Sequence, residues 1–160
     1  MIFGLLSLEK KNLYYSAPAD KKEEKYQGKF TSDDFEIREI VDADTSQEEE
    51  MYYVTFKKGC RTRPHIHASD QILVAIKGRG IVVCVDKIEI NSDGKSATIR
   101  LPPEEKSSSG SSSIIELDEG DVVCVPAGTL HWHGALENNN KSEFSHLAIR
   151  KRIDTETKWF

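Results

Sequence analysis

The sequence has few cysteines, no long apolar run and no secretory signal. Its 160 residues include only three cysteines, and none of them has the CxxC spacing of redox or zinc motifs. No apolar run approaches the roughly 20 residues that a membrane-spanning helix needs, and the apolar first eight residues lack the basic start of a secretory signal. We therefore expect a cytoplasmic chain with no disulfide framework and no membrane partner.

A basic surplus is also missing. Lysine and arginine number 22 against 27 aspartates and glutamates, which gives a net charge of −5 and a sequence pI near 5.6. Proteins that bind nucleic acid usually carry excess positive charge to neutralise phosphates. We therefore expect no nucleic-acid partner.

The third absence is a sustained helical period. From Phe30 onward, short runs of β-branched and aromatic residues alternate with Gly, Pro, Asn and Asp, which is typical of an all-β sandwich or barrel. The expected strands cover residues 35–41, 51–56, 71–77, 79–90, 97–101, 113–117, 121–125 and 144–151.

The chain has the length of one domain. We expect a single domain over residues 1–160, with an N-terminal arm at 1–27, a barrel core at about 28–152 and a flexible Ser-rich loop at 102–113. The acidic run at 47–50 is predicted to be a solvated turn, because charge runs are usually solvated.

The five histidines are grouped rather than scattered. His65 and His67 are two residues apart, His131 and His133 are two apart, and His146 lies in the last expected strand. Residues i and i+2 of an extended chain face the same side, about 6.6 Å apart. Gln71 shares the parity of the first pair, so two imidazoles and an amide oxygen could converge on one face. A further histidine from a neighbouring strand would complete a metal site.

Two spaced motifs surround these residues. They read Gly59-(x5)-His65-x-His67-(x3)-Gln71-(x6)-Gly78 and Gly120-(x5)-Pro126-x-Gly128-(x2)-His131. Both resemble the signature motifs of the cupin superfamily. The resemblance implies a jelly-roll β-barrel that holds one divalent transition metal (Mn, Fe, Zn or Ni) on His65, His67, Gln71 and His131. The family more often has Glu at the Gln71 position; a neutral amide leaves the ion its full +2 charge and makes it a stronger Lewis acid.

A narrower resemblance covers residues 125–135 and 145–149, which contain the runs His-Trp-His-Gly-Ala and His-Leu-Ala-Ile. They look like a cupin subgroup with manganese-dependent hydroxynitrile lyases and carboxymuconolactone-decarboxylase-associated relatives. The resemblance implies catalytic roles for His133 and His146, with His146 as the candidate general base, since imidazole exchanges protons near neutral pH. The alternative is that either ring only hydrogen-bonds the core backbone.

The cavity needs residues that contact a substrate. Arg61 shares parity with the metal ligands and is a candidate anion-binding residue, with a surface ion pair as the alternative. Leu73 and Phe144 are expected to form the apolar wall.

The sequence thus predicts a metal-dependent enzyme of lyase, isomerase or dioxygenase type that acts on a small polar molecule. The alternatives are a non-enzymatic small-molecule-binding or sensing cupin and a metal-free structural barrel. We also expect a homodimer, because the apolar arm can cover an exposed sheet edge.

Overall fold

The computed structural model describes residues 9–85, 87–90, 97–100, 114–136, 143–152 and 157–160. Apart from one 3₁₀ turn, the regular structure in these residues is β-strand. The elements are η1 (Glu24–Tyr26), β1 (Phe35–Val41), β2 (Glu49–Lys57), β3 (His65–Ile66), β4 (Gln71–Lys77), β5 (Gly80–Cys84), β6 (Lys87–Ile90), β7 (Ala97–Arg100), β8 (Ile114–Leu117), β9 (Val122–Val125), β10 (His131–Ala135), β11 (Glu143–Lys151) and β12 (Lys158–Trp159).

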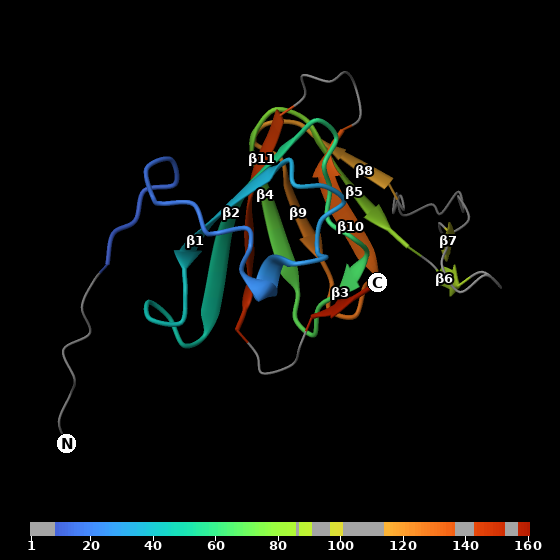
Figure 1. The fold of residues 1–160 in the computed structure, drawn as a ribbon, viewed down its shortest axis with the longest axis horizontal. Coiled ribbons are helices and arrows are strands. Elements are labelled where there is room, and N and C mark those ends of the chain that lie inside the picture. Colours follow the sequence, from blue (N-terminus) through green and yellow to red (C-terminus); the bar gives the residue numbers. More distant parts are fainter. Residues whose placement is uncertain (1–8, 86, 91–96, 101–113, 137–142, 153–156) are drawn as a thin grey trace.

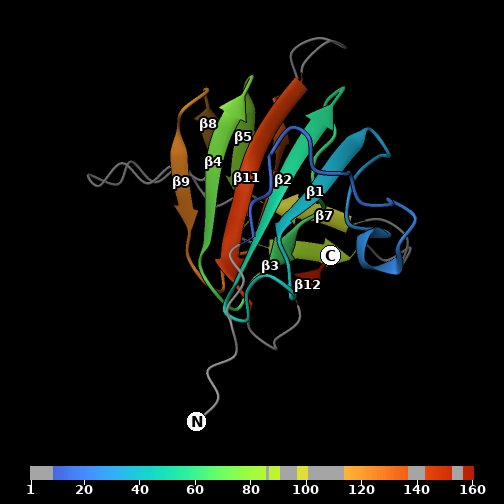
Figure 2. The same ribbon diagram turned by 90° about the vertical axis from the view of Figure 1, so that its left-hand side faces the viewer.

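The strands form two antiparallel five-stranded sheets and a separate two-stranded pair. The first sheet has the order β1-β2-β11-β4-β9 and the second the order β12-β3-β10-β5-β8, while β6 pairs with β7. Figure 1 shows the two large sheets facing each other, and Figure 2 looks onto the first sheet. The predicted all-β jelly-roll barrel is therefore confirmed.

The core follows from alternation along the strands. In β4, Gln71, Leu73 and Ala75 are buried between the sheets while the intervening side chains are more exposed, as period-2 alternation requires. The buried cluster draws apolar side chains from both sheets. Its larger members are Tyr26, Phe35, Ile37, Phe56, Leu73, Leu117 and Phe144.

Two sequence expectations need correction. The segment 79–90, predicted as one strand, divides into β5 and β6, which belong to different sheets. The acidic run at 47–50 is not wholly a solvated turn, because β2 begins at Glu49 and Glu50 is only 7% exposed. A charge run gave no sign that one of its carboxylates has a buried arginine partner. The Ser-rich loop at 102–113 lies outside the residues that the structure describes.

Both ends of the described chain pack against the barrel. In the N-terminal arm, the Ala19 N–H donates to the Ile37 carbonyl at 2.9 Å, and Tyr26 of η1 joins the core. At the other end β12 pairs with β3, beyond the core boundary at residue 152 expected from the sequence. Among the described residues, no helix is long and apolar enough to cross a bilayer.

Close backbone contact positions β10. Gly134 forms a bridge with Arg61, and a Cβ on this glycine would lie 2.5 Å from the Arg61 Cα and 2.6 Å from the Cys60 carbonyl oxygen. Only glycine allows this approach. It holds the segment before β3 against β10, next to the histidines of that strand.

Candidate metal centre

Two histidines face each other across the β3–β10 pair. His65 lies opposite His131 in register; each is 1% exposed, and their ring centroids are 4.3 Å apart. Nδ1 of His65 donates to the Arg63 carbonyl oxygen at 2.8 Å, and Nδ1 of His131 donates to the Thr129 carbonyl oxygen at 2.9 Å. Because a carbonyl only accepts, each ring carries its proton on Nδ1 and leaves the Nε2 lone pair free for a metal.

His133 is the third member of this group. Its ring lies on the same face of β10 as His131, and one ring nitrogen from each of His65, His131 and His133 falls within 4.8 Å of the others. Mutual hydrogen bonds hold its backbone to Thr62, at 2.8 Å from the Thr62 N–H to the His133 carbonyl and 3.1 Å from the His133 N–H to the threonine hydroxyl. Burial lowers the pKa of His133 well below 6.5. The three imidazoles are therefore neutral, as metal ligands must be.

Gln71 points into the same group from the opposite sheet. Its Oε1 lies 3.1 Å from Nε2 of His131. Since the other nitrogen of His131 donates to Thr129, both facing atoms carry lone pairs, and burial lowers the pKa of His131, which disfavours a proton between them. A cation satisfies both atoms at once, so the arrangement fits a divalent ion.

His67 is placed differently from the other predicted ligands. It is buried just after β3, and its Nδ1 contacts the Arg150 guanidinium and, at 3.0 Å, the Thr157 hydroxyl. A guanidinium only donates, so Nδ1 accepts and the proton lies on Nε2, which is buried with no partner. Coordination through Nε2 requires this proton to move to Nδ1, with Thr157 as its acceptor. Burial, followed by the Arg150 charge, lowers the pKa of His67 to about 2.

His146 on β11 lies beside the triad. The ring is fully buried, its centroid is 4.9 Å from that of His133, and neither ring nitrogen has a hydrogen-bond partner. Burial lowers the pKa of His146 to about 4. At neutral pH the imidazole is therefore uncharged, with a free lone pair that can accept a proton.

A buried ion network lies next to His67. The carboxylate of Glu50 contacts Nε of Arg150 and lies 3.7 Å from a guanidinium nitrogen of Arg152. The Tyr52 hydroxyl donates to the same carboxylate at 3.3 Å, and burial, with the Glu50 charge next, raises the pKa of Tyr52 to about 12. One carboxylate thus neutralises the arginine that holds His67.

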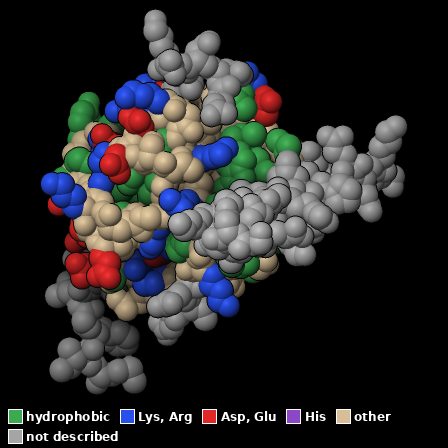
Figure 3. All heavy atoms as spheres, turned by 45° about the vertical axis from the view of Figure 1, so that its right-hand side comes forward, with side chains coloured by type: hydrophobic (Ala, Val, Ile, Leu, Met, Phe, Trp, Pro, Cys, Tyr) green, Lys and Arg blue, Asp and Glu red, His purple; other side chains and the backbone are tan. Residues whose placement is uncertain are grey.

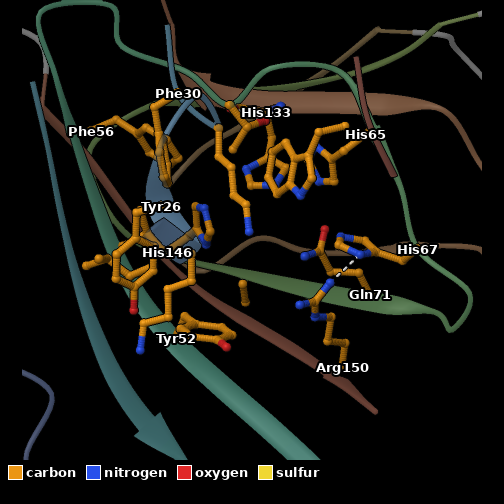
Figure 4. Close-up of a pocket in the computed structure, with 17 residues that line it drawn as sticks. Tyr26, Phe30, Tyr52, Phe56, His65, His67, Gln71, His133, His146 and Arg150 are labelled. Atoms are coloured by element: carbon orange, nitrogen blue, oxygen red, sulfur yellow. Dashed lines mark hydrogen bonds between the residues drawn. The ribbon is translucent and has the colours of Figure 1, made fainter. Parts of the chain in front are cut away.

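Several of these groups line a pocket of about 140 Å³ between the sheets, namely His65, His67, Gln71, His133, His146 and Arg150. Figure 4 shows His65, His67, Gln71 and His133 on one side of it and aromatic rings on the other. No histidine side chain is visible on the face of the molecule in Figure 3, in keeping with the burial of all five. The labelled aromatic residues of the opposite side are Tyr26, Phe30, Tyr52 and Phe56.

The predicted substrate-binding residues do not line this cavity. Arg61 is exposed, and its guanidinium lies over the Trp132 ring at 4.5 Å from the centroid. Leu73 and Phe144 are fully buried in the core cluster. The parity argument failed for Arg61 because the chain between β2 and β3 is not a continuous strand, so side-chain alternation does not extend back from His65.

Several lining or supporting residues were missed from the sequence, among them Lys29, Arg150, Thr157 and Trp159. A signal existed only for Arg150, which shares the parity of His146 and Ala148 in the last long strand. Trp159 stacks on His65 with ring centroids 4.4 Å apart. Nothing in the sequence placed the chain's end beside β3.

The family model described as Cupin matches residues 50–155. The chain belongs to the cupin family. This cupin is 30% identical over 101 residues to an (R)-mandelonitrile lyase of Granulicella tundricola, a match that covers 63% of the chain and 56% of the lyase. The match thus spans little more than half of the lyase's length.

Solved structures show the same fold at low identity. A cupin-like protein of Thermotoga maritima is 24% identical, with a TM-score of 0.58 over 91% of this chain and 84% of its own. The polyketide cyclase RemF of Streptomyces resistomycificus is 10% identical, with a TM-score of 0.63 over 96% of this chain and 85% of its own. Both likenesses concern the fold alone.

Proposed function

We propose that this cupin is a metal-dependent enzyme of lyase, isomerase or dioxygenase type that acts on a small polar molecule. The observation that carries the proposal is the set of neutral, buried imidazoles of His65, His131 and His133, with one ring nitrogen of each within 4.8 Å of the others. Gln71 completes the donor set from the other sheet, and His67 joins it if its proton moves to Nδ1. Manganese, iron, zinc and nickel all suit imidazole and amide donors.

The residues around this site have roles that suit proton transfer. A divalent ion held by these residues would polarise a substrate oxygen or activate O₂. His146 accepts a proton on an unpartnered ring nitrogen, and its burial keeps it neutral down to acidic pH. The aromatic side of the cavity supplies apolar surface next to these groups. The lyase relative supports the lyase class among the three, over the half of its length that matches.

The test combines metal analysis with a screen for turnover. We expect about one transition metal per purified chain and metal-dependent reaction in O₂ uptake or in carbonyl or cyanohydrin assays. The variant His146→Ala should keep its metal and fold but lose turnover by about 10²–10⁴-fold, the usual contribution of a general acid or base. Metal retention without any turnover in a broad screen would favour the alternative, a non-enzymatic binding cupin. Turnover within about threefold of wild type, well short of that acid–base range, would remove His146 from the proposed mechanism.

A further inference from the structure

The cavity is lined by positive charge and, among the residues that the structure describes, by no carboxylate. Its cationic lining residues are Lys25, Lys29 and Arg150. Two of these have acidic partners that do not themselves line the cavity. Lys25 contacts Glu39 and lies 3.1 Å from Glu23, and Arg150 contacts Glu50. Their charges are thus already neutralised within the protein.

Lys29 is the exception. No described carboxylate lies within ion-pair distance of its ammonium, although the side chain is half-buried. The Nζ atom is 5.3 Å from the centroid of Trp159, and that indole stacks on His65. Burial and the Arg150 charge lower the pKa of Lys29, against an opposing effect of Glu50. A partly desolvated cation without a counter-ion is a ready site for an anion.

The backbone around Lys29 fixes this position. The Lys29 N–H donates to the Tyr26 carbonyl at 3.3 Å, and the Lys29 carbonyl accepts from the Arg63 N–H at 2.9 Å. The second bond ties Lys29 to the segment that leads into β3 and His65. The lysine and the histidine triad are therefore held by the same short stretch of chain.

The remaining lining restricts the shape of the occupant. Phe30, Phe56, Tyr52 and Trp159 supply aromatic surface, and the volume of about 140 Å³ is close to the roughly 150 Å³ of a protein cavity that accepts one benzene molecule. Apart from the charge of a bound metal, the described lining supplies one ammonium without a carboxylate partner, which matches the single negative charge of a carboxylate.

We propose that Lys29 is the anion-binding residue of this cavity and that its ligand is a small monocarboxylate with one aromatic ring or an equally flat apolar body. The inference rests on the proposed function only in taking the histidine cavity as the substrate site. The carboxylate pairs with the Lys29 ammonium near Trp159, and the ring packs against the aromatic wall.

The test measures equilibrium binding of two probes of the same shape, benzoate and its neutral amide benzamide, by NMR titration. We expect wild-type protein to bind benzoate at least about tenfold more tightly, the contribution of one charge-assisted hydrogen bond. Lys29→Met and Lys29→Gln should bind benzoate no better than benzamide, with benzamide affinity unchanged. Lys29→Arg should retain the preference. Lys58→Met is the matched control, since it removes an exposed lysine that pairs with Asp34 outside the cavity.

Each titration is repeated after a chelator has removed metal, which separates this inference from the proposed function. A protein that holds no metal but loses its benzoate preference in Lys29→Met refutes the metal site and supports Lys29. A preference that survives in Lys29→Met, or that is absent from wild type, overturns the inference whatever the metal content. A preference lost on metal removal and kept in Lys29→Met assigns the carboxylate to the metal, which also overturns it.

Discussion

The two sheets contribute to the same cavity in different ways. On the second sheet, the backbone orients His65 and His131, since Nδ1 of each ring donates to a carbonyl oxygen two residues away, whereas Nδ1 of His133 has no hydrogen-bond partner among the described residues. On the first sheet, side chains hold side chains, as in the contact between Arg150 and Glu50, or nothing holds them, as with the ring of His146. A backbone partner fixes one tautomer permanently, whereas side-chain partners can exchange during a reaction. The second sheet is thus suited to metal coordination, and the first sheet to proton transfer and ligand binding.

The largest expected effect comes from removing a histidine of the second sheet whose ring the backbone orients. We expect His131→Ala to lose the metal and all metal-dependent turnover, because removing one imidazole of the triad leaves too few ligands. Metal content by mass spectrometry and turnover are measured on the same preparation. His67→Ala sharpens the comparison: the sequence motif predicts that it also loses metal, whereas the described tautomer of His67 predicts a weaker effect. Normal metal content in both variants would refute the assignment.

The Glu50→Ala substitution tests the side-chain network of the first sheet. Removing this carboxylate leaves the partly buried charge of Arg150 without its partner. Breaking a fully buried pair costs about 3–5 kcal/mol, and because the Arg150 side chain is 23% exposed we expect a loss of stability below that range. Urea unfolding followed by circular dichroism measures the change, and Glu49→Ala on the exposed side of β2 is the control. Stability equal to that of the control would show that the network contributes nothing to the fold.

Low pH is expected to destabilise the metal-free protein through buried histidines of both sheets. The folded pKa is lowered by burial to about 3 for His65 and about 4 for His146, against about 6.5 in the unfolded chain. As pH falls below 6.5 the unfolded chain binds protons that the folded chain does not, so stability decreases until pH reaches the folded pKa. Each such histidine contributes a slope of about 1.4 kcal/mol per pH unit. Urea midpoints measured from pH 7 to pH 5 should fall; constant midpoints would contradict the described burial.

The smallest effect on the site is expected from deletion of residues 1–12, because the described residues of that segment, 9–12, do not line the cavity. We predict a homodimer that depends on residues 1–12 and whose dissociation leaves metal content unchanged. Light scattering of the full chain and of the truncated chain gives the mass of each. A monomeric mass for both chains would contradict the predicted homodimer, and it would not affect the comparison of the two sheets.

The sequence predicted the site residues whose positions are set by nearby residues in the chain. His65 and His131 were predicted because glycines and a proline at fixed spacings surround them, and that spacing determines which residues of two strands meet. The parity argument for Gln71 agrees with its placement beside His131, whereas the same argument failed for Arg61, because the chain before β3 is not a continuous strand.

The rest of the site depends on contacts between residues far apart in the sequence. The partner of Glu50 is 100 residues away, and Thr157 meets His67 across 90 residues. No local pattern identifies such partners, because the pairing follows from sheet order rather than from neighbouring residues. For the same reason the sequence could not show that Lys29, before the first strand, lines the cavity.

The most direct test of the central claim locates the metal. Crystals of natively purified protein are measured at the absorption edge of whichever metal the preparation contains. The account predicts one anomalous peak per chain, at coordination distance from Nε2 of His65 and of His131 and beside the ring of His133. A metal-containing protein with no peak in this cavity, or with its peak on surface residues, would contradict it.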